Sequence, residues 1–505
     1  MDRQIRRLGL AFVALFALLF VQVAYVQVFA ADRIANQPGN FGRQLRAEYQ
    51  TQRGKILASD GTVLAESIEA PEGSVYRFER RYPRGALFGH VTGYYSRVFG
   101  RAGLEQSMNA YLSGTAPEFA ASNLTDLILG RPKIGGTVFT TIVPRLQQVA
   151  AEQLGDALGA VVAVNPSTGD VLALYSNPGY DPTPLAVGTA EEMTQAWDGL
   201  NDDPQKPLLS KAFQELYLPG STGKLVTASA ALQNGHGADE EWPNPHVLDL
   251  RTTDDDLENF GNSFCNGGSK TVPMREAFVE SCNVTFGEIS LELGADAMSR
   301  QATDYGFCPT LPPEETGCDD PAIDFALPFE NGRFPEPSYF DEREPALAYS
   351  GVGLDNVLTN PLHLSLIAAA IGNGGVMMEP RLVTEVRDAQ GRVVREFDPS
   401  VFGRPISTAT AESMRQMMVE VVERGTGSAA QIDGMTVAGK TGTATNGENR
   451  PPNAWFTAFA PAGATQDPAI AVAVIVLDGG FLGDEATGGQ VAAPIAQAVI
   501  EAYLG

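Results

Sequence analysis

Residues 217–235 read YLPGSTGKLVTASAALQNG, and this stretch joins a structural signal to a chemical one. A Pro-Gly pair interrupts the preceding chain and an Asn-Gly pair closes the segment, so the sequence predicts one helix, with Ser221 at its N-cap or in its first turn. Ser221 and Lys224 are three residues apart and therefore share one face of that helix. A serine nucleophile needs a nearby base, and a partly desolvated lysine can serve as one. Ser-x-x-Lys alone is a weak motif, because two polar residues on an exposed helix face give the same pattern.

Two more polar clusters follow, and each is weak by itself. Ser281-Cys282-Asn283 comes after residues 272–280, a run with helical spacing of apolar residues. A serine hydroxyl beside a lysine can relay a proton, and an asparagine amide can hold a peptide carbonyl. Lys440-Thr441-Gly442-Thr443 places a cation and two hydroxyls on one predicted strand. That set suits a carboxylate, and its glycine lets another backbone approach closely.

The last cluster overlaps a competing motif. Residues 434–441, GMTVAGKT, fit the phosphate-loop pattern GxxxxGK[ST] letter for letter. That motif requires a helix directly after it, with its N-terminus on the phosphates. The residues that follow, 442–452, read GTATNGENRPP and cannot form a helix. We therefore expect a strand and turn over 435–445, leading to a strand over 454–460, and no nucleotide site.

Ser-x-x-Lys, Ser-x-Asn and Lys-Thr-Gly in this order form the signature set of the penicillin-binding proteins and serine β-lactamases. The resemblance covers about residues 137–505. Residues 159–174 (GAVVAVNPSTGDVLAL) resemble the first two sheet strands of the family, and residues 423–427 (ERGTG) resemble the turn before Lys-Thr-Gly. One departure is Gly351-Val352-Gly353, where the family often has Gly-Gln-Gly.

The segment before this domain narrows the resemblance. Arg53-Gly54 and Gly103-Leu104-Glu105 resemble landmarks of the pedestal domain of class B members. Class A members carry a glycosyltransferase domain before the pedestal, and residues 32–137 leave no room for one. The chain is therefore similar to class B penicillin-binding proteins, and most of all to the actinobacterial penicillin-binding protein A branch.

The resemblance implies an α/β (α+β) fold of the serine β-lactamase/transpeptidase type, in which an antiparallel sheet is flanked by helices. The residues themselves favour the same layout. Residues 160–175 are typical of a hairpin of two buried strands, 469–477 of another buried strand, and 143–158 and 491–504 of amphipathic helices. Because strands lie near both ends, we expect the first and last elements to meet in one sheet.

The chain is expected to divide into four parts. These are a cytoplasmic tail 1–7, a transmembrane anchor 8–31, a small mixed pedestal (dimerisation-like) domain 32–137 and a penicillin-binding transpeptidase domain 138–505. Residues 239–262 and 309–344 are acidic and rich in Pro and Gly, and we expect them to be surface excursions.

The resemblance also implies roles for the motif residues. Ser221 would attack the penultimate D-Ala carbonyl of a peptidoglycan stem peptide, and Lys224 would take its proton. Ser281 and Lys440 would form the other side of the proton route, towards the leaving amine. The substrate-binding residues would be Asn283, Thr441, Gly442 and Thr443. The N–H groups of Ser221 and Thr443 would form the oxyanion hole.

The implied reaction is a D,D-transpeptidation without a metal or cofactor. An amine from a neighbouring stem peptide would resolve the acyl-serine and give a 4→3 crosslink, and β-lactams would acylate the same serine. The alternatives are a hydrolase, either a D,D-carboxypeptidase or a β-lactamase, and a non-enzymatic β-lactam sensor. The resemblance further implies docking with a membrane glycosyltransferase and with division or elongation proteins during cell wall synthesis.

The N-terminus predicts a membrane location. Arg3, Arg6 and Arg7 precede an apolar run over residues 8–31, and about 20 such residues span a bilayer. By the positive-inside rule the N-terminus would be cytoplasmic and the bulk of this single-pass protein extracellular. The alternative is a cleaved signal peptide, for which Val28-Phe29-Ala30 offers a passable cleavage site.

The composition of the chain argues against nucleic acid as a partner, and the expected location outside the cell bears on the state of the cysteines. The 505 residues carry 35 Lys and Arg against 61 Asp and Glu, a net charge of −26. Such a chain is a poor counter-ion for nucleic acid. Outside the cell, four cysteines permit disulfides in three pairings, and we expect Cys265–Cys282 and Cys308–Cys318, with four free thiols as the alternative. The four histidines are scattered, so no metal site is expected.

Overall fold

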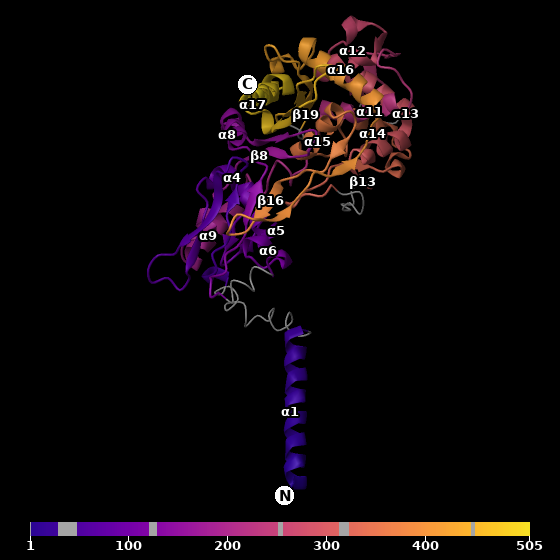
Figure 1. Ribbon diagram of the computed structural model, residues 1–505. Helices are drawn as coiled ribbons and strands as arrows, with labels where there is room; N and C mark the ends of the chain where they lie inside the picture. Colours follow the sequence, from indigo (N-terminus) through magenta and orange to yellow (C-terminus); the bar gives the residue numbers. More distant parts are fainter. Residues whose placement is uncertain (1, 29–47, 121–128, 251–255, 313–322, 446–449) are drawn as a thin grey trace.

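Two strands from near the beginning and the end of the predicted transpeptidase domain, β7 and β21, pair with each other in one antiparallel sheet, as the sequence predicts. The computed structural model describes residues 2–28, 48–120, 129–250, 256–312, 323–445 and 450–505 (Figure 1). Its five-stranded sheet has the order β19-β20-β21-β7-β8. The strands are β7 (Gly159–Val164), β8 (Val171–Asn177), β19 (Ala438–Ala444), β20 (Asn453–Ala460) and β21 (Ile470–Val476).

Helices cover both faces of this sheet, because its central strands are apolar on both sides. On one face α8 (Pro144–Leu154) and α17 (Ala493–Leu504) lie side by side and pack on β8 and β21 (Figure 1). On the other face α15 (Pro361–Gly372) packs on β7, β20 and β21 and is almost wholly buried. The predicted hairpin, the late strand and the two amphipathic helices are thus confirmed.

Beyond α15 lies a mostly helical half that carries two of the three motifs. Its helices are α11 (Lys224–Gln233), α12 (Met274–Glu280), α13 (Asn283–Asp304), α14 (Glu344–Gly351) and α16 (Thr408–Arg424). The predicted helix, with Ser221 in its first turn and Asn234 at its C-cap, is confirmed, but its first turn is of the 3-10 type. Residues Gly220–Gly223 form a 3-10 helix, and the α-helix begins only at Lys224. Gly220, at the start of this turn, has a φ of 52°, which lies outside the range of both helix types and favours glycine.

The two segments predicted as surface excursions are partly structural. Trp242 is buried in β9 (Glu241–Pro243), which pairs with β12 (Thr271–Pro273). Phe334 is buried in β14 (Arg333–Pro335), which pairs with β13 (Cys308–Thr310). The apolar residues of both segments pack on the helical half. This packing was not predicted, because the overall composition of the two segments is acidic.

A second, six-stranded sheet holds the N-terminal part, in the order β17-β16-β6-β1-β2-β3. Strands β1 and β2 of this sheet are antiparallel neighbours and lie on the two sides of Ser59-Asp60-Gly61. Two strands of this sheet come from residues after 380, so the sheet ties the early and late chain together. The division near residue 137 stays a prediction. The strands are β1 (Ile56–Leu57), β2 (Val63–Glu69), β3 (Phe78–Arg81), β6 (Thr137–Thr140), β16 (Val383–Arg387) and β17 (Val393–Glu396).

Further short α-helices and strands connect these elements. The helices are α4 (Gly85–Thr92), α5 (Gly103–Ser107), α6 (Asn109–Leu112), α9 (Thr183–Ala186) and α10 (Ala190–Asn201). The strands are β4 (Tyr95–Ser96), β5 (Gly100–Arg101), β10 (Val247–Leu248), β11 (Leu257–Glu258), β15 (Met377–Met378) and β18 (Val401–Gly403).

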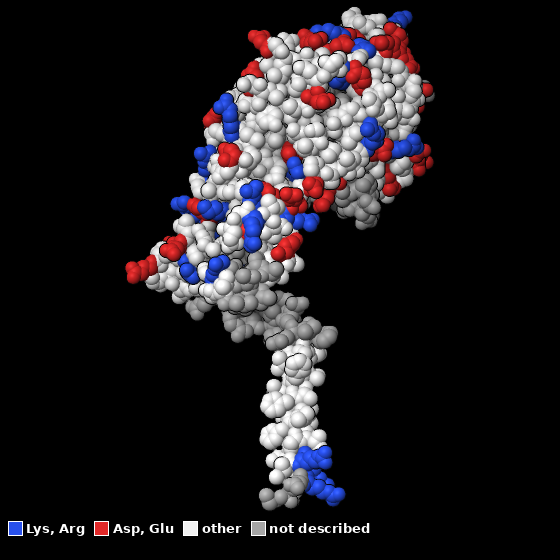
Figure 2. Space-filling view, in the orientation of Figure 1, with Lys and Arg blue, Asp and Glu red and all other residues white. Residues whose placement is uncertain are grey.

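The N-terminal helix α1 (Asp2–Val28) is apolar and unpacked. An 18-residue window of its segment Arg3–Val26 has a mean hydropathy of 2.4 and is 0% buried, so the helix is long and apolar enough to cross a membrane. Figure 2 shows basic side chains gathered at its N-terminal end and an otherwise uncharged surface along its length. The same figure shows many acidic side chains on the visible face of the remaining molecule, in keeping with the net charge of −26.

Candidate active site

The nucleophile candidate Ser221 lies on a turn held from two sides by backbone. Gly220 donates its N–H to the carbonyl of Gly353 at 2.9 Å. A Cβ on Gly220 would overlap with the carbonyl oxygen of Thr443 on β19, and its positive φ also favours glycine. A Cβ on Gly353 would overlap with the carbonyl of Gly220. The triplet Gly351-Val352-Gly353 therefore keeps the glycine that this contact requires.

Lys224 is the centre of the polar cluster. Its side chain is 0% exposed, and its Nζ lies 3.0 Å from Ser221 Oγ. The same nitrogen lies 2.7 Å from the carbonyl oxygen of Ser281, 3.3 Å from Ser281 Oγ and 2.8 Å from Asn283 Oδ1. Burial, and secondly the charge of Lys440, hold the pKa of Lys224 well below its usual value. A lysine so placed can be neutral and can accept a proton.

Ser281 joins the two lysines. It ends α12 in the left-handed region, with φ 65° and ψ 43°, which turns its side chain into the cluster. Lys440 donates to Ser281 Oγ at 2.9 Å and to the carbonyl of Thr441 at 3.2 Å. Lys440 is also 0% exposed, and burial lowers its pKa to about 7. The cluster thus contains two buried lysine amines that are linked through the hydroxyl of Ser281, and the pKa of each amine is lowered.

Asn283 lies at the start of α13, and a residue that the motifs do not include supports it. Asn259 accepts hydrogen bonds from the N–H groups of Asn283 at 2.7 Å and Val284 at 3.2 Å through its Oδ1. It therefore caps the N-terminus of α13, where backbone donors lack helical partners. Asn283 Nδ2 in turn donates to the carbonyl of Glu258 at 2.9 Å. Asn259 falls within the segment 239–262 that was predicted as a surface excursion, because no local pattern marks a cap contributed from 24 residues away.

Thr441 and Thr443 face the cavity from β19. Thr441 Oγ1 lies 2.6 Å from Thr426 Oγ1, and Thr443 Oγ1 accepts from the N–H of Gly488 at 3.4 Å. Gly442 lies between them, and a Cβ there would crowd Pro219 and Thr222 of the nucleophile turn. The glycine therefore allows β19 and the nucleophile turn to touch.

A cavity of about 450 Å³ opens between these elements. Ser221, Ser281, Asn283, Thr441, Gly442 and Thr443 line it, and Asn259 and Gly489 form parts of its walls. The structure therefore brings all eight predicted site residues into one cluster, six on the cavity wall and two lysines buried behind it. The phosphate-loop motif requires a helix directly after Lys440-Thr441, and in the structure these two residues and the next three, Gly442–Ala444, all belong to the strand β19.

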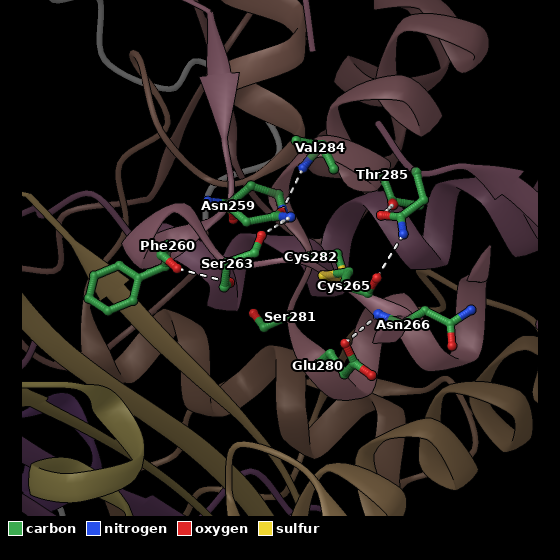
Figure 3. Close-up of a disulfide and its surroundings, with 12 residues drawn as sticks. Asn259, Phe260, Ser263, Cys265, Asn266, Glu280, Ser281, Cys282, Val284 and Thr285 are labelled. Atoms are coloured by element: carbon green, nitrogen blue, oxygen red, sulfur yellow. Dashed lines mark hydrogen bonds between the residues drawn. A yellow bond between two sulfur atoms is a disulfide. The ribbon is translucent and has the colours of Figure 1, made fainter. Parts of the chain in front are cut away.

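The predicted disulfide Cys265–Cys282 is present beside the second motif (Figure 3). Glu280 places a carboxylate within 4.8 Å of both sulfur atoms, a grouping that could hold a metal ion if the thiols were free. The two sulfurs are bonded to each other, so they offer no thiolate ligands. Cys308 is also disulfide-bonded, and its predicted partner Cys318 lies outside the described residues.

Two family models match the chain. A penicillin-binding protein transpeptidase domain matches residues 159–501, and a penicillin-binding protein A dimerisation domain matches residues 53–138. The peptidoglycan D,D-transpeptidase PbpA of Mycolicibacterium smegmatis is 38% identical over 512 residues, covering 100% of this chain and 99% of that protein. PbpA of Mycobacterium tuberculosis is 38% identical over the same length and share.

Solved structures agree with these matches. Penicillin-binding protein A from M. tuberculosis in its ceftriaxone acyl-enzyme complex superposes with a TM-score of 0.83 at 37% identity, covering 91% of this chain and 100% of that one. Its penicillin G acyl-enzyme complex gives a TM-score of 0.81 at 38% identity, covering 90% and 100%. With the signature motifs converging on one cavity, the chain belongs to the class B penicillin-binding proteins of the transpeptidase family.

Proposed function

We propose that this protein is a membrane-anchored peptidoglycan D,D-transpeptidase that works through an acyl-serine. The observation that carries the proposal is the environment of Lys224, a fully buried amine 3.0 Å from Ser221 Oγ and 2.8 Å from Asn283 Oδ1. A buried amine with a lowered pKa beside a partly exposed serine is the arrangement that an activated nucleophile needs.

In the first step the neutral Lys224 amine takes the proton of Ser221 Oγ as the oxygen attacks the penultimate D-Ala carbonyl. The substrate carboxylate lies against the hydroxyls of Thr441 and Thr443, which both line the cavity. The negative oxygen that develops is met by the N–H groups of Ser221 and Thr443. Contact between the nucleophile turn and β19 supports this pairing, since a Cβ on Gly220 would overlap with Thr443.

In the second half of acylation the C–N bond breaks and D-Ala leaves as an amine. It needs a proton, and the chain Lys224–Ser281–Lys440 offers a route from the base to the leaving nitrogen. An acceptor amine from a neighbouring stem peptide then attacks the ester, loses its proton along the reverse route, and forms the crosslink. A β-lactam acylates Ser221 by the first step and keeps its leaving group attached, so the ester persists.

The test is intact mass of the full chain in detergent after incubation with benzylpenicillin, followed over hours, with Ser221→Ala as the control. We expect one penicilloyl adduct per chain on the wild type and none on the variant. A transient adduct with drug turnover would instead support a β-lactamase-type hydrolase. A folded wild type without any adduct would contradict the proposal.

A stable penicilloyl adduct is expected for both a transpeptidase and a D,D-carboxypeptidase. A stem-peptide donor with and without an amine acceptor separates them, because only the transpeptidase yields crosslinked product in preference to hydrolysed donor.

We also propose that α1 is an uncleaved, single-pass anchor with its N-terminus in the cytoplasm and the catalytic domain outside. The support is its apolar segment Arg3–Val26 and the basic side chains at its N-terminal end (Figure 2). N-terminal sequencing of the membrane-bound protein should return Met1 or Asp2. A start after residue 28 would show a cleaved signal peptide. In that location the enzyme would work beside a membrane glycosyltransferase and the division or elongation proteins.

A further inference from the structure

The residues on both sides of Ser281 are tied to one neighbouring segment. We call residues 257–268 the strap; it forms one wall of the cavity through Asn259, Phe260, Ser263 and Cys265. Before Ser281, Glu280 accepts a hydrogen bond from the N–H of Asn266 at 2.8 Å. After Ser281, Cys282 is bonded to Cys265. Figure 3 shows both links meeting the strap at adjacent residues, with Ser281 between them.

The strap is itself fixed to the core at the same point. Asn244 donates through Nδ2 to the carbonyls of Cys265 at 2.9 Å and Ser269 at 2.8 Å, and its side chain is buried. Cys265 and Cys282 are 4% and 1% exposed. The disulfide is therefore a covalent bridge between a fixed part of the cavity wall and the residue next to Ser281.

The bridge helps to hold Ser281 in an unfavourable backbone conformation. Its φ of 65° is a conformation that costs a non-glycine residue about 1–2 kcal/mol, so the surroundings must hold it there. In that conformation its carbonyl lies 2.7 Å from Lys224 Nζ and its Oγ 2.9 Å from Lys440 Nζ. A rotation of this residue would break both contacts at once.

We infer that the Cys265–Cys282 disulfide is a positioning element for Ser281, and that its reduction lowers the rate of Ser221 acylation. The inference rests on the proposed function, since it concerns the same acyl-serine chemistry. It makes the acylation rate depend on the redox state of one bond in the cavity wall. Cys282 and Cys265 touch no reacting atom and act only through Ser281.

A dithiol can reduce the Cys265–Cys282 disulfide in two exchange steps. One thiolate of the dithiol attacks the sulfur of Cys265, a residue of the cavity wall, and Cys282 leaves as a thiolate. The second thiol of the reductant then attacks the mixed disulfide and frees Cys265. Two electrons pass to the protein, its two sulfurs end as thiols, and the reductant becomes a cyclic disulfide.

The experiment uses the full chain in detergent with Cys308→Ser and Cys318→Ser, so that only one disulfide remains. Half of the sample is reduced with dithiothreitol and desalted without oxygen, and intact mass after alkylation of an aliquot counts the free thiols. Acylation by a fluorescent penicillin is then followed in both halves. We expect the second-order rate constant of the reduced form to fall by about tenfold to 10²-fold, because a displacement of about 1 Å costs that much.

The final amount of acyl-enzyme separates positioning from unfolding. A positioning role slows acylation but leaves the end point at one adduct per chain, whereas unfolding lowers the end point. Reoxidation should restore the rate. The variant Cys265→Ala with Cys282→Ala should match the reduced form, and its failure to fold leaves the reduction experiment intact. Two free thiols with an unchanged rate constant would overturn the inference. Absence of acylation in the oxidised form would instead count against the proposed function.

Discussion

Lys440 Nζ lies 2.9 Å from Ser281 Oγ, although 159 residues separate them along the chain. The contact joins the Lys-Thr-Gly motif on β19 to the Ser-x-Asn motif. Ser281 Oγ also lies 3.3 Å from Lys224 Nζ. Ser221 completes the line at 3.0 Å from Lys224. Four polar groups from three distant segments thus form one hydrogen-bonded chain, and each prediction below changes one link or its support.

Removing the shared hydroxyl should slow acylation without preventing it. Ser281→Ala deletes the group that links both lysines, and we expect the acylation rate constant to fall by about 10²–10⁴, the usual effect of losing a proton-transfer group. Stopped-flow mixing with a fluorescent penicillin measures it. Ser167→Ala, which removes a hydroxyl in the turn between β7 and β8, is the control and should keep the wild-type rate. A rate within twofold of the wild type in Ser281→Ala would refute the relay.

Lys440 should set the pH at which Lys224 becomes active. Acylation requires neutral Lys224, and the nearby charge of Lys440 helps to lower its pKa. Lys440→Met removes that charge, so the pKa of Lys224 should rise and the acid limb of the acylation profile should move to higher pH. The profile of the second-order rate constant between pH 5 and 9 measures this. Lys55→Met, on an exposed side chain of the pedestal sheet, should leave the limb in place. An unmoved limb in Lys440→Met would contradict the coupling.

The same substitution should change how stability depends on pH. The pKa of Lys440 is about 7 in the folded protein against an ordinary 10.5, so the unfolded chain binds more protons between these values. Burial of Lys440 therefore costs most stability below pH 7, and the cost fades as pH rises towards 10.5. The free energy of unfolding of wild type minus that of Lys440→Met should increase from pH 6 to pH 10. Urea titrations at several pH values give the difference, and a flat or falling difference would be inconsistent with a lowered pKa.

Close backbone contact should make Gly220 irreplaceable. In Gly220→Ala the Cβ would overlap with the carbonyl of Thr443, so either the nucleophile turn or β19 must move. We expect acylation to fall by about 10²-fold, since a shift of about 1 Å is enough. Gly155→Ala is the matched control, because Gly155 also has a positive φ but open space around it. It should cost about 1–3 kcal/mol of stability from backbone strain alone and leave acylation unchanged. Equal acylation in both variants would argue against the contact.

The N-terminal sheet should be stabilised by one buried carboxylate. Glu105 accepts from Arg53 Nε and Arg80 Nε at 2.5 Å each and is 0% exposed. Burial raises the pKa of Glu105, but the two guanidinium groups outweigh burial and lower it overall. Glu105→Gln leaves both cations uncompensated and should cost about 3–5 kcal/mol of unfolding free energy.

The control for that variant is Glu66→Gln. The ion-pair partners of Glu66, Arg81 and Lys55, are half exposed, so this substitution should lower the free energy of unfolding by about 1 kcal/mol or less. Urea unfolding measures both. The stabilisation by Glu105 should be present near neutral pH and be lost as pH falls through its lowered pKa. Equal costs in the two variants would show that burial of the carboxylate contributes little.

Local signals in the sequence were enough for much of the architecture. Apolar runs such as residues 160–164 and 469–477 form buried strands because a strand buried on both faces needs continuous hydrophobic residues. The three motifs, in their order, named eight residues that the structure brings into one cluster, six of them on the cavity wall. The cysteine pair closing a short loop was also found, because proximity in sequence favours that pairing.

The amino-acid sequence by itself thus determined the chemistry, since residue type fixes which side chains can be nucleophile, base or carboxylate ligand. Only the tertiary structure decided how they work together. The 3-10 turn at Gly220 depends on contact with Gly353 and Thr443, and the left-handed Ser281 depends on its links to the strap. Asn259 caps a helix from a distant loop, and the low pKa of Lys440 follows from burial. Local patterns cannot encode these features, because each is created by groups that meet only when the chain has folded.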